Sequence, residues 1–151
     1  MRVISDFHQL STMVGQEMAV GDWFLVDQAR IDAFANATND HQWIHVDPAR
    51  AARESPFKTT IAHGFLTLSL LPYLVDQALR IEGPRLVVNY GINRVRFPGP
   101  VKSGTRIRVQ VKLDAFKQIP GGAEIEWRLN VEREGEVKLG CAATVVIRCF
   151  D

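Results

Sequence analysis

The sequence predicts an α+β fold in which one long apolar helix is followed by several long antiparallel strands. Residues 64–79 contain almost no polar side chain before Asp76, which predicts a helix surrounded by protein. From Arg85 onward apolar and polar residues alternate, most clearly over residues 125–131, as is typical of half-buried strands. A sheet of such strands can bury the helix by curling around it.

Length and composition predict a single domain that covers residues 1–151. Hydrophobic residues make up 46% and charged residues 23% of the chain, as in ordinary globular proteins. The net charge of +1 gives no reason to expect nucleic acid or an anionic membrane as a partner. The N-terminus lacks the apolar run of a signal peptide, and the apolar stretch 61–81 is interrupted by charges and a proline. We therefore expect a cytoplasmic protein without a membrane partner.

The two cysteines, Cys141 and Cys149, are expected to be reduced thiols. Both fall in one strand-like run, where eight residues of strand separate their Cα atoms by roughly 26 Å. A disulfide tolerates at most about 7 Å. No cysteine or histidine spacing in the chain is typical of a metal site, so we expect no metal.

The first half of the chain predicts short elements with recognisable caps. Asp27 is a plausible N-cap for a helix over Gln28–Ala37, and Asp47 followed by Pro48 predicts a second helix that ends at Arg53. A further helix is expected over residues 5–13 and a short strand over Asp22–Val26.

The second half predicts a kinked helix and four strands. Pro72 removes one backbone hydrogen bond and should kink the helix over 64–79. Glycine and proline turns then separate four runs, which predict an antiparallel meander: Leu86–Phe97, Arg106–Phe116, Glu124–Arg133 and Lys138–Phe150. The outer face or edge of this sheet needs cover, which a second subunit can supply, so we expect a homodimer.

The segment around Asp40 and His45 suggests acid/base chemistry. A carboxylate and an imidazole five residues apart can share proton transfer on one water molecule. Gly64 begins the apolar helix, where a backbone N–H can hold a developing oxyanion. Each residue alone has a simpler explanation: a turn cap, a core histidine and a helix start. Their joint occurrence favours catalysis, and the pattern leaves open which of Asp40 and His45 is the primary base.

Four separated motifs in the chain resemble those of a known family. The resemblance rests on Asp40-x4-His45-x-Asp47-Pro48, His63-Gly64-Phe65, Asn89-Tyr90-Gly91 and Arg94-Val95-Arg96-Phe97-Pro98. In this order they are similar to the MaoC-like dehydratase family, in particular to single-domain (R)-specific enoyl-CoA hydratases and NodN-like proteins. The match extends over residues 15–148.

The resemblance implies a hot-dog fold, in which a long helix is wrapped by an antiparallel sheet, and a homodimer. It implies addition of water to a trans-2-enoyl-CoA to give a (3R)-hydroxyacyl-CoA. No separate cofactor is implied, because CoA is part of the substrate. The family's catalytic aspartate and histidine correspond to Asp40 and His45, and its oxyanion-hole amide to Gly64.

Two positions depart from the family pattern. Gln42-Trp43 stands where many relatives have Asn-Pro, and Pro72 stands where some have a serine near the catalytic pair. Gln42 keeps an amide that can orient water. The candidates for substrate contact are Gln42, His63, Phe65, Asn89, Arg94 and Arg96.

Some of these candidates have competing explanations. His63 can instead support the loop before Gly64, and the two arginines can hold CoA phosphates or be ordinary solvated charges.

Three other functions compete with the hydratase. A hot-dog acyl-CoA thioesterase needs a carboxylate on the central helix, where only the late Asp76 is available. A non-catalytic acyl-CoA-binding dimer of the NodN type has no need of both Asp40 and His45. A dehydratase that acts on acyl-carrier-protein thioesters would share the site and differ in substrate.

Overall fold

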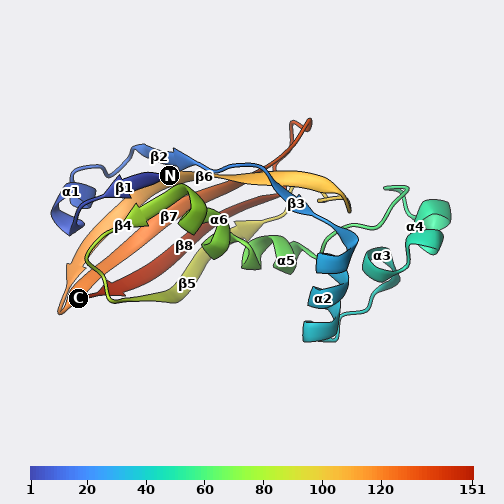
Figure 1. The fold of residues 1–151 in the computed structure, drawn as a ribbon, viewed down its shortest axis with the longest axis horizontal. Helices are drawn as coiled ribbons and strands as arrows, with labels where there is room; N and C mark the ends of the chain where they lie inside the picture. Colours follow the sequence, from blue (N-terminus) through green and yellow to red (C-terminus); the bar gives the residue numbers. More distant parts are fainter.

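A curved antiparallel sheet with two helices across its concave side forms the body of the molecule (Figure 1). The computed structural model describes all residues from Met1 to Asp151. It confirms the predicted α+β class and the hot-dog architecture. Three further helices, α2 to α4, lie together at one end of the sheet, and both chain termini lie toward the other end.

Six strands form the main sheet, in the order β2-β6-β7-β8-β5, with β3 also paired to β6. All of their pairings are antiparallel. Their bounds are β2 Glu17–Val20, β3 Phe24–Val26, β5 Leu86–Arg96, β6 Thr105–Ile119, β7 Gly122–Arg133 and β8 Cys141–Phe150. A separate parallel pair joins β1 (Arg2–Ile4) to β4 (Leu79–Ile81).

The predicted meander is correct for three strands and wrong for the fourth. β6, β7 and β8 pair in sequence order, but β5 pairs with β8 at the far edge of the sheet. The connection 97–104 therefore crosses the sheet, since β2 and β3 occupy the other edge of β6. β1, β2 and β4 were not expected, because runs of three or four residues are too short to show a period.

Three helices begin at aspartate N-caps, of which Asp27 and Asp47 were predicted from the sequence and Asp6 was not. The carboxylates of Asp6, Asp27 and Asp47 each accept a hydrogen bond from a backbone N–H in the first turn. The bounds are α1 Phe7–Ser11, α2 Gln28–Thr38, α3 Trp43–Val46, α4 Pro48–Glu54, α5 Gly64–Ser69 and α6 Leu71–Ala78. No helix combines the length and hydrophobicity that crossing a membrane requires.

The central helix is two helices rather than one kinked helix. α5 ends at Ser69, α6 begins at Leu71, and Leu70 caps both. Pro72 lies in the first turn of α6, where its missing N–H costs nothing, so the chain starts a new helix there.

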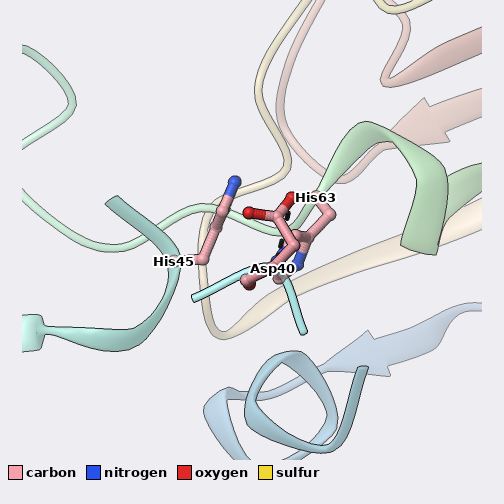
Figure 2. A group of neighbouring side chains, drawn as sticks. All are labelled: Asp40, His45 and His63. Carbon is pink, nitrogen blue, oxygen red and sulfur yellow. Dashed lines mark hydrogen bonds and ion pairs between the residues drawn. The ribbon is translucent and has the colours of Figure 1, made fainter. Parts of the chain in front are cut away.

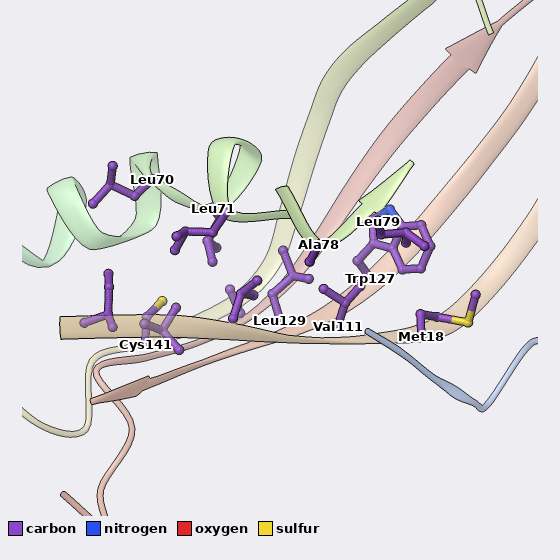
Figure 3. Packing of buried hydrophobic residues seen from close by; sticks show 14 of the residues in the cluster. Met18, Leu70, Leu71, Ala78, Leu79, Val111, Trp127, Leu129 and Cys141 are labelled. Atoms are coloured by element: carbon purple, nitrogen blue, oxygen red, sulfur yellow. The ribbon is translucent and has the colours of Figure 1, made fainter. Parts of the chain in front are cut away.

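Every second side chain of β6 and β7 points inward, and these side chains form one side of the hydrophobic core (Figure 3). The inward side chains of these strands are fully or almost fully buried and pack under Leu71, Leu74 and Ala78 of α6. They are Ile107, Val109, Val111, Leu113, Ile125, Trp127, Leu129 and Val131. Burying each such side chain contributes roughly 1.5–3 kcal/mol.

One side of this arrangement is uncovered within the chain. All of β5 except Val95 is exposed, and Phe65 of α5 is 68% exposed. A cavity of about 930 Å³, mostly apolar, opens between α6, the inner face of β5 and strands β7 and β8. The prediction that protein surrounds the helix therefore holds on one face only.

Candidate functional site

The loop after α2 and the short helix α3 place Asp40 and His45. α2 ends at Thr38, its C-cap Asn39 adopts the left-handed conformation with φ of 57°, and Asp40 follows in the loop. His45 was expected in this loop but lies in the short helix α3. The bond from the His45 N–H to the Gln42 carbonyl, 2.9 Å long, closes its single turn. Figure 2 shows that the side chains of Asp40 and His45 lie beside that of His63.

His45 is a buried imidazole with a defined proton arrangement. Its side chain is 7% exposed, and Nδ1 lies 2.6 Å from the carbonyl oxygen of Ile61. Because a carbonyl only accepts, Nδ1 carries the proton and the neutral ring presents the lone pair of Nε2. Burial lowers the pKa of His45, and the nearby His63 lowers it further, against opposing effects of the Ile61 carbonyl and Asp40. The neutral, proton-accepting form is therefore favoured.

His63 lies directly behind this pair. Its ring stacks on that of His45, with centroids 3.7 Å apart and an interplanar angle of 23°. Its Nε2 donates to the main-chain carbonyl of Asp40 over 2.9 Å, and the same nitrogen lies 3.9 Å from the Asp40 carboxylate. His63 is 3% exposed, so it is part of the interior wall of the site.

Asp40 and His45 lie close enough together for one water molecule to bridge them. One carboxylate oxygen of Asp40 and one ring nitrogen of each histidine lie within 4.8 Å of one another. A water that donates two hydrogen bonds of about 2.8 Å at a tetrahedral angle joins atoms about 4.6 Å apart. The Asp40 carboxylate is 55% exposed, so the site is open to solvent on that side.

The same three groups are poorly arranged for a metal ion. Lone pairs of imidazole nitrogens lie in the ring planes, and the planes of His45 and His63 are nearly parallel and stacked. Nδ1 of His45 and Nε2 of His63 also face backbone carbonyls. Two such rings do not converge on one cation.

Gly64 presents a free backbone N–H at the start of α5. No main-chain carbonyl accepts from it, since it precedes the first internal bond of the helix. Because α5 has only six residues, its dipole is short, and an oxyanion role rests on the N–H itself. A β-carbon at this position would lie 2.8 Å from Cδ2 of Phe97, so the ring of Phe97 requires glycine here.

The remaining substrate-contact candidates divide into three places. Gln42 and Phe65 are exposed beside the catalytic segments, and the Phe65 ring lies 6.1 Å from that of Phe97. Asn89 lines the apolar cavity. Arg94 and Arg96 flank Val95, which packs against the core, so they point to the opposite face of β5.

Within one chain, therefore, the site beside Gly64 contains Asp40, His45 and His63. Asn89 lies apart from this site. Neither arginine forms an ion pair, and the guanidinium of Arg96 donates to the neighbouring carbonyl of Val95. Both arginines lie at the end of β5 that precedes Phe97, the residue whose ring lies against Gly64.

Sequence reasoning missed Gln28, which fixes the position of α3. Its Nε2 donates to the carbonyl of His45 over 2.7 Å and to Asp32 over 2.8 Å, while its Oε1 accepts from the buried Thr60. A glutamine at the first position of a helix carries no signal of such a role. Only the fold brings residues 28, 45 and 60 together.

The chain is similar to known proteins along nearly its whole length. The chain is 43% identical to 3-hydroxyacyl-thioester dehydratase Z of Mycobacterium tuberculosis over 98% of both sequences. It is 52% identical to Nodulation protein N of Rhizobium leguminosarum bv. viciae, over 95% of the chain and 94% of that protein.

Among solved structures, the (R)-hydratase from A. caviae superposes with a TM-score of 0.68 at 26% identity, over 89% of this chain and 94% of that one. The MaoC like domain family matches residues 9–134. This match covers most of the chain, from α1 through β7, and includes Asp40, His45 and Gly64. The resemblance that the sequence motifs indicated is confirmed, and the chain belongs to the MaoC-like family.

Proposed function

We propose that the protein is an (R)-specific enoyl-CoA hydratase, which adds water to a trans-2-enoyl-CoA and, in reverse, dehydrates a (3R)-hydroxyacyl-CoA. The observation that carries this proposal is the separation of at most 4.8 Å between the Asp40 carboxylate and the His45 imidazole, which suits one bridging water. The names of the relatives, a 3-hydroxyacyl-thioester dehydratase and an (R)-hydratase, support the same chemistry.

In this mechanism His45 acts as the base. The Ile61 carbonyl holds the proton on Nδ1, so Nε2 accepts a proton from the water as its oxygen attacks C3 of the substrate. Asp40 accepts the second hydrogen of the water and orients it. Transfer of the proton from His45 to C2 on the same face gives syn addition and returns the site to its starting state.

The negative charge that forms on the thioester oxygen must be stabilised by a hydrogen-bond donor. The free N–H of Gly64 suits this role. Arg94 and Arg96 have no carboxylate partner and are available to CoA phosphates from the outer face of β5.

A homodimer forms part of the proposal. β5 is a long edge strand with both faces exposed, and five of its apolar side chains are 41–57% exposed. Such an edge favours pairing with a second copy, which would also cover the cavity between α6 and β5. We further propose that the protein acts in the cytoplasm, in fatty-acid metabolism.

The test follows loss of enoyl-thioester absorbance with crotonyl-CoA and with a longer trans-2-enoyl-CoA, with chiral analysis of the product. Wild type is compared with Asp40→Asn and His45→Ala, and His41→Gln serves as the control. His41 is exposed and bonds only to Asn36, so its loss should leave the rate unchanged. We expect the 3R alcohol from wild type, and rates lower by about 10²–10⁴-fold in the two site variants.

Other outcomes of this assay identify the competing functions. Release of free CoA indicates a thioesterase, and binding without turnover indicates a non-catalytic acyl-CoA-binding protein. Turnover of acyl-carrier-protein thioesters alone indicates a carrier-dependent dehydratase. Hydration that survives both Asp40→Asn and His45→Ala contradicts the proposed mechanism.

A further inference from the structure

We propose that His63 is a positioning residue for the catalytic pair, which acts by donating a hydrogen bond from Nε2 to the main-chain carbonyl of Asp40. This inference rests on the proposed function and assigns a specific role to a residue for which the sequence left open a substrate contact or support of the loop before Gly64. At 3% exposure, His63 is too deeply buried in this chain to be a surface contact for the substrate.

His63 contacts all of the segments that carry the site. One face of its ring stacks on His45 of α3 at 3.7 Å, and the ring of Phe34 of α2 lies 5.1 Å away. Its Nε2 reaches the loop at Asp40, and Gly64 is the next residue in the chain. Movement of this one ring would therefore shift the base, the carboxylate and the oxyanion donor relative to one another.

The hydrogen bond to Asp40 matters because little else fixes that residue. The Asp40 side chain is 55% exposed, and its nearest ionic contact is Nε2 of His63 at 3.9 Å. The loop follows the left-handed Asn39, where a helix has just ended. A buried donor on the Asp40 carbonyl thus holds the backbone from which the carboxylate projects.

The hydrogen bond also fixes which ring nitrogen of His63 donates. Nε2 carries a proton because its partner is a carbonyl, which can only accept. Nδ1 is buried and has no hydrogen-bond partner. Nε2 is therefore the nitrogen through which His63 holds the Asp40 loop.

The main test compares three substitutions of His63. His63→Gln keeps an amide N–H near the position of Nε2, while His63→Asn carries the same amide one methylene short of the Asp40 carbonyl. His63→Phe keeps an aromatic ring against His45 but has no donor. Crotonyl-CoA hydration gives kcat and KM for each variant, with His41→Gln as the surface control and circular dichroism to establish folding.

We expect His63→Gln to retain kcat within about threefold, and His63→Asn and His63→Phe to lose about 10- to 100-fold, with KM little changed in all three. A role in general stability alone would not separate glutamine from asparagine. Folded Asn or Phe variants with wild-type kcat overturn the proposal, as does a Gln variant as slow as the Asn variant.

A second measurement does not depend on turnover or on the variants folding. Nitrogen NMR of histidine-labelled wild-type protein, at about neutral pH, reports which ring nitrogens carry protons. We expect Nε2 of His63 to carry a proton, and a ring protonated at Nδ1 alone overturns the proposal. Absence of hydration by wild type would instead contradict the proposed function, while the tautomer would still be measured.

Discussion

The ring of Phe97 fills the space that a β-carbon on residue 64 would need. An added Cβ would lie 2.8 Å from Cδ2 and 3.0 Å from Cε2 and Cγ of this ring. Phe97 follows the last residue of β5, and Gly64 is the first residue of α5. The contact therefore sets how closely the edge strand approaches the N-terminus of the central helix, where the proposed oxyanion donor lies.

This contact allows the N–H of Gly64 to be tested separately from its lack of a side chain. Gly64→Ala alone should destabilise the protein and slow hydration, because the new methyl group displaces Phe97. Phe97→Ala frees this space, so the double variant Gly64→Ala, Phe97→Ala should recover much of the rate that Gly64→Ala alone loses. Gly64→Pro in the same background removes the N–H and adds a small ring, and we expect a kcat about 10²–10³-fold lower than that of the alanine partner.

Proline suits this comparison because the backbone already fits it. Residue 64 is the first position of a helix, and His63 has φ of −58° and ψ of 138°, as a residue before proline requires. Thermal unfolding of the two double variants controls for stability. Equal kcat values for them would show that the Gly64 amide does not stabilise the transition state.

The lowered pKa of His45 predicts a pH-dependent stability. The ordinary value for the unfolded chain is 6.5, and burial places the folded value below it. Between these two values the unfolded chain binds a proton that the folded chain does not. The free energy of unfolding should therefore fall as pH drops through 6.5, by at most about 1.4 kcal/mol per pH unit.

Urea unfolding at about pH 7.5 and about pH 5.5, at constant protein concentration, measures this effect. His45→Gln should remove the His45 contribution, whereas His8→Gln, at an exposed position, should leave it in place. A wild-type stability that is the same at both pH values, or a His45→Gln variant with the full dependence, would contradict this explanation.

The exposed edge strand predicts a dimer that charge can disrupt. Val87 and Ile92 of β5 are 57% and 46% exposed in the single chain. Lysine at both positions should leave the monomer folded and shift the molar mass in light scattering from dimer to monomer, because paired strands would bury the two charges. Val137→Lys is the matched control, since Val137 is fully exposed in a turn away from β5. If the dimer survives the double substitution, its interface does not involve β5.

The two cysteines should be inert in the folded protein. Both lie on β8, are buried and unpaired, and burial raises the pKa of each thiol to about 11. The reactive thiolate is therefore scarce, and an aromatic disulfide reagent should label neither cysteine until the protein unfolds in urea. Rapid labelling of the native protein would show that β8 opens, or that the thiols are more accessible than this fold allows.

Local patterns were enough to predict most elements. The caps at Asp27 and Asp47 predicted the starts of α2 and α4, and period-two runs predicted the four long strands. Pairing across the sheet is a non-local property, so the place of β5 beside β8 could not be obtained from its own sequence. The break at Leu70 was predicted only as a kink, because a proline permits either a bend or a new helix start.

The sequence alone determined the chemistry available at the site: Asp40, His45 and Gly64, their order and their family resemblance. Only the tertiary structure decided how these groups are held. The carbonyl of Ile61, sixteen residues from His45, fixes its tautomer, and His63 stacks behind it while donating to Asp40. Residue types are encoded along the chain, but proton positions depend on partners that folding brings together from distant segments.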